Sequence, residues 1–400
     1  MNELLIAHRI PPNVTPLRQW LAEVASRTNV LTSKEIYPHY AGDFAGTHAI
    51  PDYLDDIAFE QTVAEIVRHH PITKLIHVTE DDILRCAQAR DRYDLPGLRY
   101  IDALPWRDKY HMKRFVRWTG VPTPEFAAPS SIVDAEVFAR RVGYPVVVKP
   151  RLGFASRGVK VVHDSAGLRE AASAWDVDDV LIESYTPGFV YHVDGFMHDG
   201  KPLYVSVSRY LNDCMAFHDG LPLGSVQLDR DSENFQRVAR FAEEVIPALP
   251  PVDFSPFHLE VFHTPDDELV FCEIACRLGG AHIMESLTYA TGVNPAQLWI
   301  RHQAGLVDGR TVAVKDRGNR YGWLLVPPKT GVLTGIDEPT GYPFIKDFIV
   351  KAPIGKRFDG AHASTDSFVA FVVEGTDSAD LERNIRFCSE LSNTLGRWAT

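Results

Sequence analysis

The chain has 400 residues, of which 45% are hydrophobic and 24% are charged, and its formal net charge is −12. This composition is that of a globular protein, and the length gives two or three domains room to bury their own cores. The negative charge, with no run rich in Lys and Arg to offset it, argues against a protein that binds nucleic acid.

Membrane insertion and disulfide bonding are also not expected. No apolar run approaches the ~18–20 residues that cross a bilayer, and the first residues do not resemble a signal peptide. The five cysteines are scattered, which favours a reduced, cytoplasmic protein. Cys272 and Cys276 have a spacing found in metal sites, but no second pair or histidine cluster accompanies them, which argues against zinc.

Residues 1–105 alternate short apolar runs with helical patterns, which predicts a small parallel α/β domain. The expected strands are at residues 3–8, 29–33 and 74–79, and the expected helices are at 16–25, 58–70 and 80–97. The turn after the first strand lacks the glycine fingerprint of dinucleotide-binding domains, so an NAD(P) oxidoreductase is not expected.

The rest of the chain has a mixed pattern. Residues 106–120 predict a helix with its lysines on one face, and strands are frequent from about 136 to 305, several of them in antiparallel pairs. Residues 234–249 form the clearest amphipathic helix among these strands. Beyond Gly305, turn-rich strands precede a final helix over residues 379–396. We therefore expect a central domain at 106–305 and a C-terminal α+β region at 306–400.

The stretch FHLEVFHTPDDELVFCEIACRLGG, residues 257–280, predicts a β-hairpin around its Thr-Pro-Asp-Asp-Glu turn. If the turn is centred between the two aspartates, Glu260 opposes Glu273 and His263 opposes Val270. Opposed residues share one face, with Cβ atoms ~4.5–5.5 Å apart. Two carboxylates at that separation repel each other unless one is protonated or a cation lies between them.

A divalent cation is the explanation that we favour for this pair. Phe262 and Phe271 are expected on the same face as Glu260 and Glu273, so the face is not simply solvated. Carboxylates without imidazole or thiolate neighbours favour Mg²⁺, which completes its shell with water and phosphate oxygens. The alternative is an exposed hairpin with two solvated glutamates. If the metal hypothesis is right, removing one carboxylate should relieve a repulsion in the metal-free protein.

A second motif, PVVVKPRLGFASRGVKVV at residues 145–162, places Lys149 at the end of an apolar strand. The nine-residue loop that follows is rich in small residues and leads to another strand rather than a helix, so it is not a Walker A loop. Such a loop can still cover phosphates with N–H groups and the Ser156 hydroxyl. The alternative for Lys149 is a lysine that reaches water and packs little. Lys109, at a helix start after Asp108, reads in isolation as a surface lysine.

Taken together and in order, these segments resemble the ATP-grasp superfamily over about residues 78–280. The segments that carry the resemblance are TEDDILRCAQARDRYDLPG, DKYHMKRFVRWTGVPTP, GYPVVVKPRLGFASRGV, VLIESYTPG, and FHLEVF with FCEIACRLGG. Within the superfamily, FHLE followed by E-I-x-x-R-L-G-G most resembles carboxylate–amine ligases of the L-amino-acid ligase kind. The fold that this implies has an N-terminal parallel α/β domain, a nucleotide-binding core with lobes at 106–185 and 186–305, and a small C-terminal α+β region.

The resemblance also implies a set of site residues. The implied contacts to ATP are Lys109, Lys149, Ser156, Gly158, Glu183, Ser184 and Tyr185. Glu260 and Glu273 would bind Mg²⁺, or Mn²⁺ in its place, and Arg277 would face the transferring phosphoryl group. Two positions depart from the family pattern. Val190 stands where an acidic ribose ligand is expected, so His192 or Asp194 would take that contact, and Ala275 leaves open whether one or two Mg²⁺ bind.

For the substrates, the sequence supplies candidates rather than an identity. His258, Arg209 and the Gly279-Gly280 pair are expected to bind them, and the further candidates are His218, His282 and Glu285. The implied activity joins a carboxylate to an amine, with amino acids as the expected partners, through an acyl phosphate with release of ADP and phosphate. The alternatives are a biotin-carboxylase-like enzyme that activates bicarbonate and an ATP-binding module without catalysis. A homodimer is left open.

Overall fold

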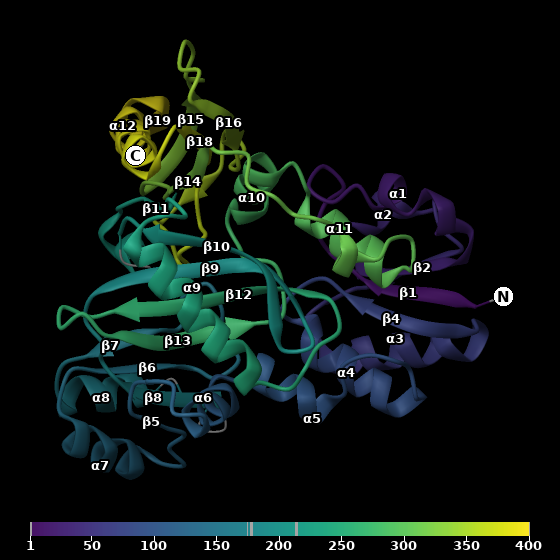
Figure 1. Ribbon diagram of the computed structural model, residues 1–400, viewed down its shortest axis with the longest axis horizontal. Helices are drawn as coiled ribbons and strands as arrows, with labels where there is room; N and C mark the ends of the chain where they lie inside the picture. Colours follow the sequence, from purple (N-terminus) through teal and green to yellow (C-terminus); the bar gives the residue numbers. More distant parts are fainter. Residues whose placement is uncertain (1, 174, 177–178, 213–214, 400) are drawn as a thin grey trace.

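The computed structural model describes residues 2–173, 175–176, 179–212 and 215–399. Its described strands form four sheets. Figure 1 shows the N-terminal domain on the right, the small lobe at the lower left, and the large sheet, which runs up to the C-terminal region with the three-stranded sheet. No helix in these ranges is long and apolar enough to cross a membrane.

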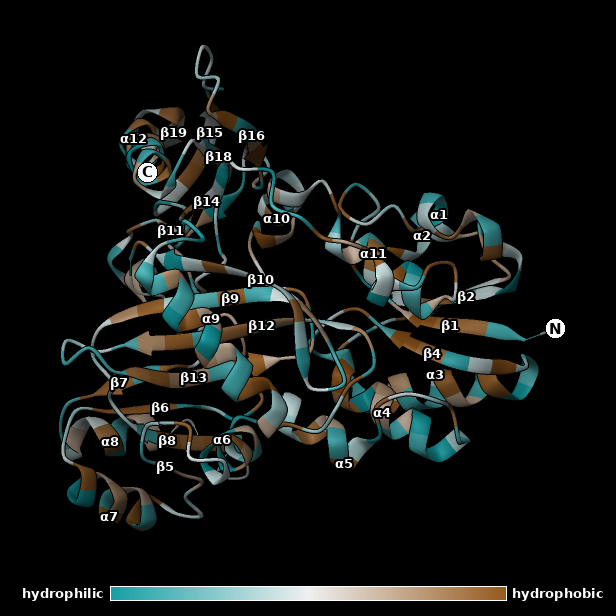
Figure 2. Ribbon diagram, in the orientation of Figure 1, coloured by the Kyte–Doolittle hydropathy of each residue, from teal (hydrophilic) through white to brown (hydrophobic). Residues whose placement is uncertain are grey.

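The N-terminal domain is a parallel sheet of order β3-β2-β1-β4 with helices packed against it, as predicted. Its strands are β1 (Glu3–Ala7), β2 (Thr28–Ser33), β3 (Gly46–Ile50) and β4 (Ile72–His77), and its helices are α1 (Leu17–Trp20), α2 (Tyr37–Tyr40), α3 (Asp56–His69), α4 (Asp82–Tyr93) and α5 (Tyr100–Ala103), with 3-10 turns η1 (Ala22–Arg27) and η2 (Leu104–Trp106). The helix expected over 16–25 is divided between α1 and η1. Figure 2 shows β1 changing from hydrophilic at its start to hydrophobic where it enters the protein.

The small lobe follows α6 (Lys109–Trp118) and contains a sheet of order β5-β8-β6-β7. Its elements are β5 (Phe126–Ala127), α7 (Ile132–Val142), β6 (Val146–Pro150), β7 (Lys160–Val162), α8 (Ser165–Ala172) and β8 (Val180–Ser184). Helices α7 and α8 bury Phe138 and Leu168 in a core shared with Val146, Val148 and Ile182. The nine residues between β6 and β7 form the predicted loop.

The large sheet is antiparallel and has the order β13-β12-β9-β10-β11-β14-β18-β16. Its strands are β9 (Phe189–His198), β10 (Lys201–Tyr210), β11 (Leu223–Gln227), β12 (Ser255–His263), β13 (Leu269–Ala275), β14 (Arg320–Val326), β16 (Ile345–Val350) and β18 (Val369–Gly375). The sheet continues across residue 305, because β14 pairs with β11. The domain boundaries themselves stay predictions.

Helices and a small sheet complete the fold. The remaining elements are η4 (Ala216–Asp219), α9 (Glu233–Val245), η5 (Ile246–Ala248), α10 (Ile283–Thr291), α11 (Pro295–Gln303), η6 (Gly309–Thr311), β15 (Gly331–Ile336), β17 (Arg357–Phe358), α12 (Ser378–Leu395) and β19 (Gly396–Ala399). Helix α9 buries Phe235 and Phe241 against Phe257 and Phe271 of the β12–β13 hairpin. Each such side chain contributes about 1.5–3 kcal/mol by burial, so this contact fixes the back of the hairpin.

Candidate active site

The β12–β13 hairpin has the predicted register at its centre, where Glu260 lies opposite Glu273. The register shifts next to this pair, so His263 faces Leu269 and the predicted pairing of His263 with Val270 is wrong. The cause is one extra residue on β13 between Phe271 and Glu273, a β-bulge. Between the bulge and the turn, the side chains of β13 therefore lie on the face opposite to the one predicted.

The bulge also corrects the expected neighbours of the glutamates. Phe262 lines the same cavity as Glu260 and Glu273, as expected, but Phe271 is fully buried in the core on the far side of the sheet. Cys272 takes its place on the cavity side. Of the two expected aromatic side chains, Phe262 alone lies on the face that carries the two carboxylates.

The first cleft lies between the small lobe and this hairpin and has a volume of about 550 Å³. Its lining is apolar at one end, where Val147, Val161, Val190 and Phe262 contribute, and charged at the other. The charged and polar lining residues include Lys109, Lys149, Ser156, Glu183, Ser184, Tyr185, Glu260 and Glu273. A cleft of this size, with apolar walls and converging polar groups at one end, is typical of a small-molecule site.

Lys149 extends from β6 into the charged end of the first cleft and is 7% exposed. Its Nζ lies 2.9 Å from the Glu183 carboxylate of β8, and Lys113 Nζ lies 3.2 Å from the same carboxylate. Burial opposes the charge of Glu183, but the two lysines outweigh it and hold the pKa of Glu183 below its ordinary value. The alternative of a lysine that reaches water and packs little is therefore wrong, because the side chain is buried within an ionic network.

Lys109 is the first residue of α6, and its position is fixed by the preceding residue. Asp108 caps the helix by accepting hydrogen bonds from the N–H groups of Tyr110 and His111. Lys109 Nζ then lies 3.1 Å from Glu273 and donates to the Gly153 carbonyl oxygen at 2.6 Å. Burial would raise the pKa of Glu273, but Lys109 and Lys149 together lower it to about 2. The cation beside this carboxylate is thus a lysine of the chain itself.

The loop between β6 and β7 lies over the charged end of the first cleft. Ser156 lines the cleft, while Gly158 has a left-handed φ of +72° and is not itself in the lining. The Ala155 carbonyl oxygen accepts a hydrogen bond from the N–H of Ser364 in the C-terminal region. The loop is therefore held from both sides, by Lys109 and by a segment far away in the sequence.

A second cleft, of about 390 Å³, opens on the other side of the two glutamates. It shares Phe154, Ala155, Ser156, Glu260 and Glu273 with the first cleft. Its remaining lining comes from the N-terminal domain, the large sheet, the segment after β13, and residues 364–365. The predicted residues that line it are His258, Arg277, Gly279, Gly280 and Glu285. The two clefts meet at the paired carboxylates.

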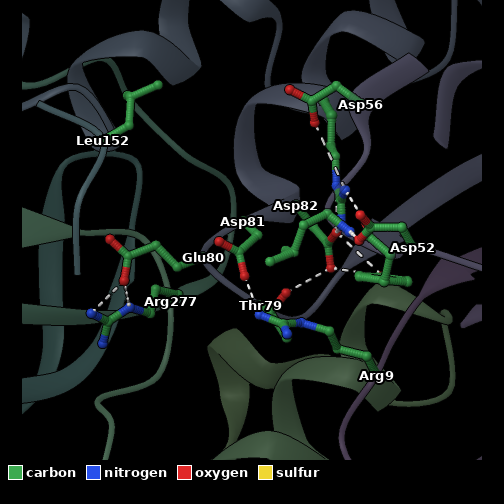
Figure 3. Close-up of polar contacts among 12 residues, drawn as sticks. Arg9, Asp52, Asp56, Thr79, Glu80, Asp81, Asp82, Leu152 and Arg277 are labelled. Atoms are coloured by element: carbon green, nitrogen blue, oxygen red, sulfur yellow. Dashed lines mark hydrogen bonds and ion pairs between the residues drawn. The ribbon is translucent and has the colours of Figure 1, made fainter. Parts of the chain in front are cut away.

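Arg277 follows β13 and is held by a residue of the N-terminal domain. Its guanidinium lies 2.9 and 2.7 Å from one carboxylate oxygen of Glu80, which extends from the loop after β4, as Figure 3 shows. Arg107 lies 3.5 Å from the other oxygen of Glu80. Burial alone would raise the pKa of Glu80, but Arg277 and Arg107 lower it. Arg277 thus has a fixed orientation at the edge of the second cleft.

Glu260 has polar neighbours on the other side of the pair. Tyr210 of β10 donates a hydrogen bond to its carboxylate at 2.9 Å, and His258 Nε2 lies 3.6 Å from the same oxygen. His258 donates through Nδ1 to buried Asp194 at 2.8 Å. Burial opposes the charged imidazolium, but Asp194 raises the pKa of His258 to about 9. His258 is therefore a charged neighbour of the second cleft at neutral pH.

The predicted ribose contact by His192 or Asp194 is not supported by their positions. His192 is 1% exposed and hydrogen-bonds to Asp194 and to Ser225, and neither His192 nor Asp194 lines the first cleft. The ring of Tyr210 lies tilted beside that of His192, with ring centroids 4.8 Å apart. His192, Asp194 and His258 lie close enough to hold a metal ion, but their hydrogen bonds to one another already satisfy them.

The substrate role predicted for Arg209 is not supported by its position either. Arg209 pairs with Glu382 of α12 at 2.7 Å and contacts the ring of Phe189, and it lines neither cleft. Successive side chains of a strand point to opposite faces, so Tyr210 is the residue of this pair that reaches a cleft, the second one. His282 is buried outside both linings, and the side chain of His218 lies outside the described residues.

Gly279 lies where a side chain has no room. A Cβ at this position would lie 2.5 Å from the Asp194 carboxylate and 2.6 Å from Ile283. Gly280, in contrast, has open space around it. The first glycine is therefore required for packing, while the second leaves its backbone accessible in the second cleft.

Sequence reasoning missed three residues that the structure places at this site. Lys113 lies one helical turn after Lys109 on the same face of α6, and this i, i+4 spacing was a usable signal. Tyr210 and Glu80 reach the second cleft from distant elements. Their contacts depend on how the elements assemble, so no local pattern marked them.

Comparison with known proteins identifies the fold. A model of the ATP-grasp domain family matches residues 142–285, which include β6, the glycine loop and the β12–β13 hairpin. The structure is similar over the whole chain to the L-amino acid ligase from Bacillus licheniformis, with a TM-score of 0.79 and 18% identity, covering 100% of this chain and 99% of that one. Residues 142–285 therefore match the ATP-grasp domain family, and the protein has the ATP-grasp fold.

The relatives found by sequence include two that are named as ligases. The L-arginine-specific L-amino acid ligase of Bacillus subtilis is 26% identical over 258 residues, which are 62% of this chain and 61% of the relative. A D-alanine–D-alanine ligase of Bacillus anthracis is 32% identical over 107 residues, 26% of this chain and 34% of the relative. The matches thus span about three fifths of the first relative and a third of the second.

Proposed function

We propose that this protein is an ATP-dependent ligase that joins a carboxylate to an amine, with amino acids as substrates. The observation that carries the proposal is the junction of the two clefts. One cleft has the size and lining for a nucleotide, the other is open to a second molecule, and both end at Glu260 and Glu273. We therefore name them the nucleotide cleft and the acceptor cleft. The names of the relatives, which are amino acid ligases, support the same conclusion.

The paired carboxylates fit a hard divalent cation. Their donors are oxygens, and Lys109 and Lys149 lie beside them, where they would meet phosphate oxygens. Glu260 and Glu273 would hold Mg²⁺ or Mn²⁺, and the bound cation would offset the negative charge of phosphate groups. Lys109, which now pairs with Glu273, would then be available to bind a phosphate group.

The chain's own residues then position the reaction. The adenine would lie between the apolar walls near Val147 and Phe262, beside the backbone of Ser184 and Tyr185. In the acceptor cleft the substrate carboxylate attacks the γ-phosphoryl group, and ADP leaves. Arg277 neutralises charge on the acyl phosphate, the amine attacks its carbonyl carbon, and phosphate leaves. In this scheme catalysis is mainly positioning and charge stabilisation.

The test is product analysis. Incubation with ATP, Mg²⁺ and mixed L-amino acids should give ADP, phosphate and a new amide that mass spectrometry identifies. Formation of AMP and pyrophosphate would contradict the acyl phosphate mechanism. Phosphate release that depends on bicarbonate alone would favour the biotin-carboxylase-like alternative, and ATP binding without any turnover would favour a non-catalytic module.

Free thiols in the described part of the chain, at Cys86, Cys272, Cys276 and Cys388, support the predicted reduced compartment. Cytoplasmic location and a homodimer stay predictions.

A further inference from the structure

A third cavity, of about 380 Å³, lies beside the edge strand of the N-terminal sheet. We name it the β4 cavity. Its described lining comes from β4, the segment between α4 and α5, the start of β12, and α11, and it shares no described lining residue with the nucleotide or acceptor cleft. The proposed ligase activity makes no use of it.

Arg90 places a buried positive charge in the wall of the β4 cavity. It comes from α4 and is 4% exposed. Its N–H groups donate to the carbonyl oxygens of Leu75 and Leu98 and to His77 Nδ1. Among the described residues no carboxylate forms an ion pair with it, and burial lowers the pKa of Arg90. A buried guanidinium without a counter-ion is unusual, because charges removed from water are normally paired.

His77 adds a hydrogen-bond donor, and its contact with Arg90 shows which ring nitrogen carries the proton. A guanidinium can only donate, so His77 Nδ1 is the acceptor and the ring proton lies on Nε2. Burial holds the pKa of His77 well below its ordinary value, which keeps the ring neutral. In the described chain His77 Nε2 has no hydrogen-bond partner.

Trp299 of α11 also has a buried N–H donor without an acceptor among the described residues. Its ring lies 5.5 Å from that of His77, centroid to centroid. Lys74 of β4 lines the same cavity and is half-buried. The lining acids are Asp102, which is exposed, and Asp253, which faces Arg310 and two histidines and whose charge also partly offsets the lowering of the pKa of Lys74 by burial. The wall thus has buried donors without acceptors next to a cation without an ion pair. Such a wall suits a ligand that carries hydrogen-bond acceptors.

We propose that the β4 cavity binds a small organic oxyanion, a carboxylate or a phosphate ester. Its charged group faces Arg90, His77 and Lys74, and its body packs against the apolar wall around Leu98 and the Trp299 ring. Cys276 lines this cavity and the next residue, Arg277, lines the acceptor cleft. A bound oxyanion would therefore lie directly behind the backbone that carries Arg277.

Calorimetric titration of the full chain tests this proposal with three probes of similar size: benzoate, phenyl phosphate and neutral benzyl alcohol. The titrations are made with a saturating non-hydrolysable ATP analogue and Mg²⁺, which fill the nucleotide cleft. At least one of the two anions should bind with a one-to-one ratio and benzyl alcohol should not. The anion that binds more tightly shows whether carboxylates or phosphate esters are the preferred class.

Variants locate the binding. Lys74→Gln removes a cation that makes no hydrogen bond or ion pair in the described structure, and Trp299→Phe removes the indole N–H but keeps a ring. Each should weaken anion binding about tenfold or more, while Lys201→Gln, an exposed lysine elsewhere, should not. Thermal melts check that the variants fold. The proposal is overturned if neither anion binds, if benzyl alcohol binds equally well, or if both variants bind the anion like the parent.

Discussion

The nucleotide cleft and the acceptor cleft share the paired carboxylates but differ in where their other walls come from. Most of the nucleotide cleft is built by residues 145–190 and by the β12–β13 hairpin. The acceptor cleft also takes Ile10, Val14 and Glu80 from the N-terminal domain and residues 364–365 from the C-terminal region. Under the proposed function, the residues that would bind the nucleotide lie mainly in one module, while those that would bind the substrate come from three parts of the chain.

This difference suggests where specificity resides. The nucleotide end needs lysines, a small-residue loop and two carboxylates, which suit any reaction that transfers a phosphoryl group. The acceptor end is lined in part by loops, which in general tolerate changes of sequence better than strands and helices do. Substitutions at the shared carboxylates should therefore have the largest effects, and those at the outer walls should have smaller and more selective ones.

The largest effect is expected for Glu273→Gln, at the junction of the clefts. Turnover should fall by about 10²–10³-fold or more, because both the charge beside the phosphates and the proposed metal ligand are lost. The sequence alone suggested that this change would relieve a repulsion without metal. The structure predicts the opposite, because Glu273 is the partner of buried Lys109 at 3.1 Å. The metal-free variant should be less stable, by about 1–3 kcal/mol.

The pH dependence of this stability has a defined sign. Since the pKa of Glu273 is lowered to about 2, its ion pair stabilises the native state above the unfolded pKa of about 4.3. That stabilisation should disappear as the pH falls from about 4.3 to about 2. Thermal melts of the parent and of Glu273→Gln should therefore converge over this range. A variant that is as stable as the parent at pH 7 would contradict the Lys109–Glu273 pairing.

A smaller effect, confined to the nucleotide cleft, is expected for Lys149→Met. Loss of a charge-assisted contact to phosphate should weaken ATP binding about 10–100-fold, as calorimetry would show. Because Lys149 is buried beside Glu183, the variant should also melt earlier, although Lys113 remains as a partner of that carboxylate. Lys160→Met, an exposed lysine on β7, is the control and should change neither quantity.

Glu80→Gln tests the contribution of the N-terminal domain to the acceptor cleft. Without the carboxylate, Arg277 loses its partner at 2.7 Å and its fixed orientation, so kcat should fall about 10–100-fold. The KM for ATP should change little, because Glu80 does not line the nucleotide cleft. Asp81→Asn is the control, since the neighbouring carboxylate pairs with Arg9 instead (Figure 3). Equal losses in both variants would indicate damage to the domain rather than to Arg277.

The parts of this site that sequence could predict are those encoded locally. The hairpin turn and alternating strands gave Glu260 opposite Glu273, and the strand-loop-strand pattern gave Lys149 and its loop. The bulge on β13 could not be predicted, because one added residue has no signature in the hydrophobic period. It is the reason that Phe271 is in the core.

The parallel α/β fold of the N-terminal domain was predictable for the same reason, since its strands and helices alternate along the sequence. Contacts between distant segments were not. The pairing of Glu80 with Arg277 joins residues 197 positions apart, and Ser364 reaches the glycine loop from the C-terminal region. Such contacts arise from the packing of three regions, and local propensity carries no information about them.

The last prediction concerns two neighbours on β10 that strand alternation sends to opposite faces. Tyr210 donates to Glu260 at 2.9 Å, so Tyr210→Phe should leave that carboxylate less well oriented and raise the Mg²⁺ concentration for half-maximal turnover about tenfold. Arg209 pairs with Glu382 instead, so Arg209→Gln should leave the Mg²⁺ requirement and the KM of both substrates unchanged. Its expected effect is a loss of stability of about 0.2–1 kcal/mol. Magnesium titrations and thermal melts of both variants measure these quantities. If Arg209→Gln raised the KM for a substrate and Tyr210→Phe changed nothing, the face assigned to each side chain would be wrong.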